Sequence, residues 1–152
     1  MVPRLRRRTA AIGAGMLAAA LGTASAAVAA PAAAPRNVVV YNCATDAVSA
    51  PKTFTLACGD GNSQLTGLRW TGWGAARATA TGRLRLNMCT PTCVSGKWVS
   101  IPATVTVGRR ANQEANQAYR RMTIRLKGAV PKGQARVETY RISSTTGPSL
   151  VG

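Results

Sequence analysis

The chain has 152 residues, with 20 Lys and Arg against 4 Asp and Glu and no His, which gives a formal net charge of +16. This length predicts one ordinary domain. Without histidine, and with its few acids far apart in sequence, the chain lacks the usual proton-transfer groups and metal ligands. We therefore expect a non-catalytic protein with no cofactor, no metal site and no catalytic residues.

The first 29 residues have the pattern of an export signal. A basic start is followed by an apolar run over residues 10–21 and by small residues before Ala30. The run is too short and too rich in alanine for a good membrane span. Cleavage after residue 29 leaves 16 cations against 4 acids, a net charge of +12. The prediction is a soluble monomer without a membrane span, secreted or associated with the cell envelope.

The remainder is typical of a small β domain. We expect a disordered Ala/Pro lead-in over 30–36, a β domain over 37–143 and a flexible tail over 144–152. Short alternating segments between turn residues predict an all-β fold, an antiparallel β-sandwich or small barrel of about seven strands stabilised by two disulfides. Residues 111–118 have no apolar stripe, which indicates a solvated loop with at most one helical turn. The predicted strands are 38–41, 52–58, 68–73, 76–88, 97–107, 120–127 and 135–142.

The four cysteines are predicted to form two local disulfides. Among the three possible connectivities, nearest-neighbour pairing joins Cys43 to Cys58 and Cys89 to Cys93. The competing interpretation is a four-cysteine zinc site. An oxidising destination, the lack of two-residue knuckle spacing and the lack of histidine all weigh against zinc.

Two short motifs admit both a structural and a ligand-binding interpretation. Asp60 and Asn62 could bind calcium, but a turn explains the pair, because no bidentate acid follows downstream. Trp70 and Trp73 are three residues apart, so only one faces the core unless a bulge rotates the chain. We expect the tryptophans to be packing residues; the alternative is an exposed Trp73 or Trp98 that stacks on a ligand beside arginines.

The charge pattern supplies the candidate binding residues. Arginines and a lysine alternate with apolar residues on two predicted strands, so they should face solvent. If those strands are neighbours, the cations form one basic face that binds anionic cell-wall polymers or other polyanions. The alternative is a surface that is merely soluble. The candidate anion-binding residues are Arg83, Arg85, Arg121, Arg125 and Lys127.

Three motifs carry a resemblance. The chain has C-x-D-G-N at Cys58–Asn62, W-x-x-W-G at Trp70–Gly74 and C-x-P-x-C at Cys89–Cys93. Over roughly residues 43–107 it resembles a group of small exported actinobacterial proteins with these motifs. The resemblance implies export and disulfide bonding and supplies no active-site residue.

Two functions from different classes follow. The leading hypothesis is an extracellular or envelope module that binds polyanions through its basic face. The alternative is a secreted protein-binding module, such as a protease inhibitor, with a constrained loop at Cys89–Cys93 or Gly59–Asn62 as its contact. Arginines exposed in one patch would favour the first, and a rigid protruding loop with an apolar tip would favour the second.

Overall fold

A computed structural model describes residues 37–151 of the chain, and every regular element in that range is a strand. The predicted signal peptide and the Ala/Pro lead-in lie outside the described residues. Within them, the structure contains no helix long and apolar enough to cross a membrane.

Strand pairing runs in the order β2-β1-β7-β6-β5-β4-β3, and β8 pairs with both β7 and β9. β1 lies parallel to β7, whereas the other pairs are antiparallel. The strands are β1 (Val38–Tyr41), β2 (Ala47–Val48), β3 (Phe54–Thr55), β4 (Ser63–Thr71), β5 (Ala78–Asn87), β6 (Trp98–Gln113), β7 (Asn116–Leu126), β8 (Val137–Ser143) and β9 (Gly147–Leu150).

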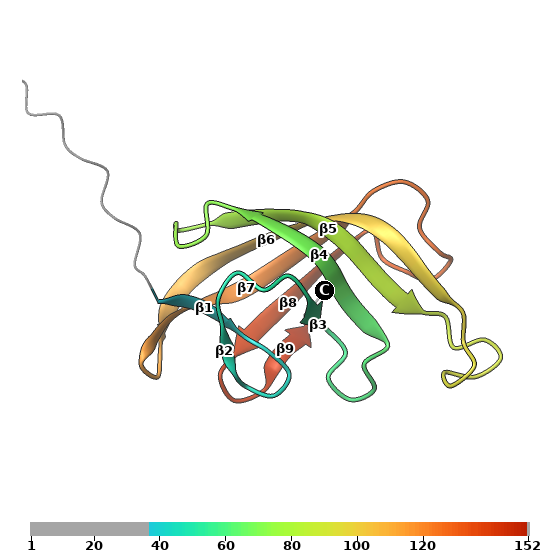
Figure 1. Cartoon of the computed structure of the whole chain (residues 1–152), viewed down its shortest axis with the longest axis horizontal. Coiled ribbons are helices and arrows are strands. Elements are labelled where there is room, and N and C mark those ends of the chain that lie inside the picture. The colour runs from blue at the N-terminus through green and yellow to red at the C-terminus, as the bar shows by residue number, and fades with distance from the viewer. Residues whose placement is uncertain (1–36, 152) are drawn as a thin grey trace, which may run out of the picture. The chain divides into compact units, whose positions relative to one another are not determined.

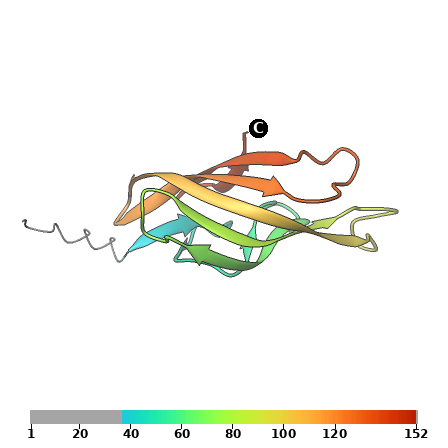
Figure 2. The same ribbon diagram turned by 90° about the horizontal axis from the view of Figure 1, so that it is seen from above.

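The sheet curls into a half-barrel with its apolar face inside (Figures 1 and 2). Alternating residues of β5, β6 and β7 fill the core, as their period-2 pattern predicts. The all-β class is therefore confirmed, with seven strands in the main path and two disulfides. The parallel β1–β7 pair was not predicted, because it joins segments more than 70 residues apart.

Both Trp70 and Trp73 pack against the core, because the chain turns sharply between them. Gly72 adopts φ 70°, in the left-handed region that glycine tolerates without a Cβ clash. The two indole rings meet edge to face with centroids 4.7 Å apart, and Trp73 also packs 5.2 Å from Tyr119. The packing interpretation thus holds for both residues, while Trp98 remains 39% exposed.

The predicted disulfide pairing is confirmed. Cys43 is bonded to Cys58 and Cys89 to Cys93, which excludes the zinc interpretation for all four cysteines. The first bridge joins the loop between β1 and β2, at one end of the sheet path, to the loop after β3, at the other end. It therefore holds the curled sheet together across its open side.

Two segments differ from the sequence-based expectation. Residues 111–118, expected to be a solvated loop, belong to the β6–β7 hairpin, in which Asn112 pairs with Gln117 across a turn at Glu114. Within the expected tail, Gly147–Leu150 forms β9 on the edge of β8. In both places backbone pairing to an existing strand stabilises a segment that shows no alternating apolar pattern.

Asp60 and Asn62 form a self-contained turn. Asp60 accepts hydrogen bonds from the backbone nitrogen of Asn62 at 3.0 Å and from its side chain at 2.8 Å. The pKa of Asp60 is lowered, mainly because the backbone N–H of Asn62 donates to its carboxylate. Since both carboxylate oxygens are used within the loop, the turn interpretation accounts for the motif.

Candidate anion-binding face

The outer face is defined here as the side of strands β4 to β8 whose side chains point away from the core. On β7 its residues include Arg121 and Arg125, which are exposed and alternate with buried Met122 and Ile124. Arg125 lies opposite Thr104 of β6, and Arg121 lies opposite Arg141 of β8. Cations from several strands thus share one face of the sheet.

The five predicted residues all point outward, but their strands are not neighbours. β6 separates β5 from β7, so the condition under which these cations would form one continuous face, that their strands are neighbours, is not met. Pro102 of β6 lies opposite Arg83, and its carbonyl oxygen accepts a hydrogen bond at 2.8 Å from the backbone nitrogen of Lys127. The two halves of the predicted set therefore lie on either side of one intervening strand.

Arg83 and Arg85 are engaged within the protein. The Arg83 guanidinium donates to the side-chain and backbone oxygens of Ser100 at 2.6 and 2.8 Å. The guanidinium of Arg85 lies over the ring of Trp98, 4.8 Å from its centroid, a favourable cation–π contact. This contact also occupies one face of the partly exposed Trp98, which therefore offers less surface for ligand stacking.

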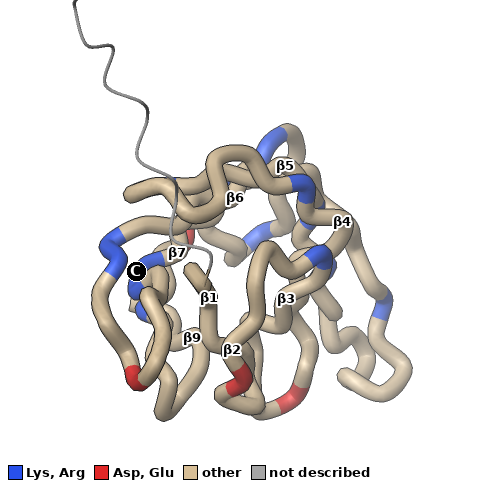
Figure 3. The backbone as a smooth tube through the Cα atoms, turned by 60° about the vertical axis from the view of Figure 1, so that its left-hand side comes forward, with Lys and Arg blue, Asp and Glu red and all other residues tan. Residues whose placement is uncertain are grey.

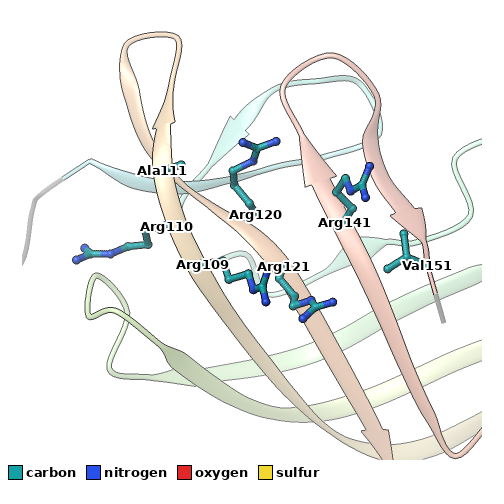
Figure 4. Close-up of a pocket in the computed structure, with 7 residues that line it drawn as sticks. All are labelled: Arg109, Arg110, Ala111, Arg120, Arg121, Arg141 and Val151. Carbon is teal, nitrogen blue, oxygen red and sulfur yellow. The ribbon is translucent and has the colours of Figure 1, made fainter.

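The main concentration of cations lies elsewhere, around a hollow between β6, β7 and β8. This first hollow has a volume of about 380 Å³ and is open to solvent. Figure 4 shows Arg109 beside Arg121, with Arg120 and Arg141 above them. Its lining residues are Arg109, Arg110, Ala111, Arg120, Arg121, Arg141 and Val151.

A second hollow adjoins the first. It has a volume of about 660 Å³ and shares Arg109 and Arg121 with its neighbour. Here the β4–β5 loop contributes Arg77, and two outward threonines, Thr106 and Thr123, supply hydroxyl groups. The shared arginine pair thus lies between two adjacent cationic depressions.

Local geometry of the β6 end explains the crowding of arginines. Val105 and Val107 face the core, so strict alternation would turn Arg109 inward as well. Arg109 instead adopts φ 55°, which interrupts the alternation, and its side chain is exposed. Arg110 instead turns toward the β4–β5 loop and donates to the carbonyl oxygen of Gly74 at 2.6 Å (Figure 4). Arg110 therefore helps to position the loop that carries Arg77.

Tyr119 fixes the same loop from inside. Its hydroxyl donates to the carbonyl oxygen of Ala75 at 2.7 Å and accepts from the backbone nitrogen of Gly74 at 3.0 Å. Burial is the main cause that raises the pKa of the Tyr119 hydroxyl, so it remains a neutral donor at physiological pH. The wall of the second hollow is thus held in place by buried hydrogen bonds.

Figure 3 marks the backbone positions of the four Asp and Glu residues, all of which fall within residues 37–151. Asp46 follows β1, Asp60 precedes β4, and Glu114 is in the β6–β7 turn. Glu138 pairs with buried Ile124, so it faces inward, and it accepts a hydrogen bond from the Tyr140 hydroxyl at 3.1 Å. Among residues 37–151, therefore, no acidic side chain is interspersed with the cations of the outer face.

This arrangement suits an anionic group. Guanidinium groups stay charged at any physiological pH and present planar donor pairs that match phosphate and carboxylate oxygens. Like charges directly opposite each other on neighbouring strands, as at Arg121 and Arg141, destabilise a sheet. A bound anion between them would remove that repulsion.

Sequence reasoning missed Arg77, Arg109, Arg120 and Arg141. A signal was present, because the doublets Arg109-Arg110 and Arg120-Arg121 flank the segment expected to be a loop. An antiparallel hairpin brings such flanking doublets side by side. Once residues 111–118 are recognised as part of a hairpin, the hollow follows from the register.

The loop named in the alternative hypothesis is also well ordered by contacts. It projects between β5 and β6 at the right of Figure 1 and carries Val94, whose side chain is fully exposed. Buried Asn87 anchors its base: the amide donates to the carbonyl oxygen of Cys93 at 2.7 Å and accepts from the backbone nitrogen of Cys89 at 3.0 Å. A Thr92–Ser95 hydroxyl contact of 2.8 Å closes its tip.

Comparison of the chain with protein families, curated proteins and solved structures returned no match. The resemblance to exported actinobacterial proteins therefore stays a prediction.

Proposed function

We propose that this protein is a secreted or envelope-associated, non-catalytic module that binds anionic polymers through its outer face. The observation that carries the proposal is the pair of adjoining hollows that share Arg109 and Arg121 and have no acidic side chain in their lining within the described part of the chain. Two depressions side by side suit a chain with repeated anionic groups better than a single small ion. The two disulfides are consistent with an oxidising, extracellular location.

Binding of this kind has a defined salt dependence. Each phosphate that a cation neutralises releases a counterion, so the logarithm of the affinity falls linearly with the logarithm of salt concentration. Polymer identity contributes less than charge density, because guanidinium–phosphate contacts carry no sequence information. The proposal therefore predicts steep salt dependence for wall teichoic acid, heparin and single-stranded DNA.

Replacing the three best-placed arginines of the hollows with glutamine is expected to lower polyanion affinity at least about tenfold at low salt. The slope of log affinity against log salt concentration should also become shallower by about one for each lost phosphate contact. Fluorescence or calorimetric titration at two salt concentrations measures both quantities. The variant is Arg109→Gln, Arg121→Gln, Arg141→Gln.

A matched control removes the same charge from outside the outer face. The three lysines that the control replaces are exposed and lie in loops. The control therefore changes the net charge by the same amount and leaves the hollows intact. Equal losses in both variants would show that net charge alone attracts polyanions, and no loss in either would contradict the proposal. The control is Lys52→Gln, Lys97→Gln, Lys132→Gln.

A second candidate function is recognition of a protein through the Cys89–Cys93 loop. The specific observation that favours it is Val94, a fully exposed apolar side chain on a loop held by a disulfide and by Asn87. A preorganised loop loses little conformational entropy on binding, which is how constrained loops achieve affinity. The chemistry fits a partner with a small apolar pocket, such as a protease that accepts β-branched residues.

Changing Val94 to Asp is expected to abolish inhibition of a secreted serine protease with such a pocket, because a carboxylate entering an apolar pocket loses its hydration without compensation. Residual activity of elastase-type proteases, titrated with the protein, measures the effect. Ala129→Asp, in the exposed β7–β8 loop, is the control. Absence of inhibition by the unmodified protein would eliminate this candidate.

A further inference from the structure

A line of threonines crosses the outer face. Strand register places Thr71 opposite Thr79, Thr79 opposite Thr106, Thr106 opposite Thr123, and Thr123 opposite Thr139. One hydroxyl from each of five neighbouring strands therefore lies in a single row. Because neighbouring strands are about 4.8 Å apart, the hydroxyls repeat at roughly that interval across the sheet.

Threonine is common on outward strand positions, since its branched side chain suits a pleated surface, and facing threonines often bond to each other. In this row, however, none of the five hydroxyls has a hydrogen-bond partner among residues 37–151. Some hydroxyls elsewhere on the molecule are instead bonded to one another, as in the Thr92–Ser95 and Ser143–Thr145 contacts. The row thus presents donors and acceptors that are available to a ligand.

The threonine row runs into the second hollow and its arginines. Thr106 and Thr123, which face each other, line the second hollow together with Arg77, Arg109 and Arg121. A ligand whose anionic group is held by these guanidinium groups would have its neighbouring atoms over the threonine hydroxyls.

A neighbouring outward row lies on the side of the threonine row opposite the two hollows, and it contains two arginines. Cations therefore flank the threonine hydroxyls in both directions along the strands. The neighbouring row consists of the outward residues Arg69, Thr81, Thr104 and Arg125, with an arginine near each end.

We propose that the outer face selects phosphate polymers whose repeating units carry free hydroxyl groups, that is, polyol or sugar phosphates, over polyanions that lack them. The inference rests on the proposed polyanion-binding function. Phosphates bind the arginines, and the hydroxyl-bearing links donate to and accept from the threonine row. Nucleic acid fits less well, since base stacking needs open aromatic faces and Arg85 lies on Trp98, the exposed aromatic near this face.

The test separates hydroxyl recognition from charge. The variant Thr106→Val, Thr123→Val keeps side-chain shape and strand propensity but removes two hydroxyls from the second hollow. We expect its affinity for poly(glycerol phosphate) to fall by about tenfold, as the loss of two neutral hydrogen bonds implies. Affinity for inorganic polyphosphate with the same number of phosphates should fall clearly less, because that polymer offers the threonine hydroxyls only phosphate oxygens and no hydroxyl-bearing links.

The control variant is Thr53→Val, Thr55→Val, which lies on or before β3 and outside the row. Equal losses on both polymers, or no loss on poly(glycerol phosphate), would overturn the inference. If the arginine variant loses binding while the threonine variant binds both polymers normally, the inference fails and polyanion binding stands. If poly(glycerol phosphate) and polyphosphate bind equally well to all variants, both proposals fail.

Discussion

Replacing both Cys43 and Cys58 with Ser is expected to lower the free energy of unfolding by about 3 kcal/mol, the value that chain entropy gives for a loop of this length. The bridge closes 15 residues of sequence. It also links the loop between β1 and β2, at one end of the strand path, to the loop after β3 at the other end, so we expect its loss to weaken the closure of the curled sheet. Urea unfolding of the double variant measures the change.

The comparison variant, Cys89→Ser with Cys93→Ser, is expected to cost at most about 2 kcal/mol, because a shorter loop constrains less unfolded-chain entropy. This bridge spans only 4 residues and lies in a projecting loop away from the core. Equal losses, or a greater loss for the short bridge, would contradict the argument from loop length and sheet closure.

Changing Gly147 to Ala is expected to cost about 2–4 kcal/mol, because left-handed strain and a backbone overlap combine at this position. Gly147 has φ 65°, and a Cβ there would lie 2.5 Å from the carbonyl oxygen of Asn42. That carbonyl cannot easily move, since it accepts a hydrogen bond from the backbone nitrogen of Thr45 at 3.0 Å and adjoins the Cys43 bridge. Thermal unfolding measures the loss.

Gly128→Ala is the matched control for this substitution. Gly128 has a similar φ of 76°, but a Cβ there has nothing within 4 Å. Its cost should be about 1 kcal/mol, from backbone strain alone. If both variants lose the same stability, the close contact between β9 and the loop after β1 does not contribute to the cost of Gly147→Ala, and the proposed backbone overlap is wrong.

The strands predicted from sequence are those with a clear local pattern. Met122, Ile124 and Leu126 alternate with polar residues, and this period-2 signal is a property of the segment itself. The two disulfides were also predictable, because close spacing favours local pairing. Outward-facing cations on β5 and β7 follow from the same alternation.

The candidate site depended on contacts that no local pattern encodes. Whether Arg83 and Arg121 share a surface is decided by which strands are neighbours, and β6 lies between them. The arginine hollow arises because the β6–β7 hairpin places Arg109 beside Arg121, while β8 adds Arg141 and the β4–β5 loop adds Arg77. The threonine row likewise requires the register of five strands.

By itself, the sequence determined the all-β class, the four bonded cysteines and the excess of cations, because these follow from alternation, spacing and composition. Only the tertiary structure decided that β1 pairs in parallel with β7, that Gly147–Leu150 forms a strand, and that the arginines gather at one end of the outer face. The physical reason is that pairing between distant segments gains its hydrogen bonds and packing only after the chain has closed on itself.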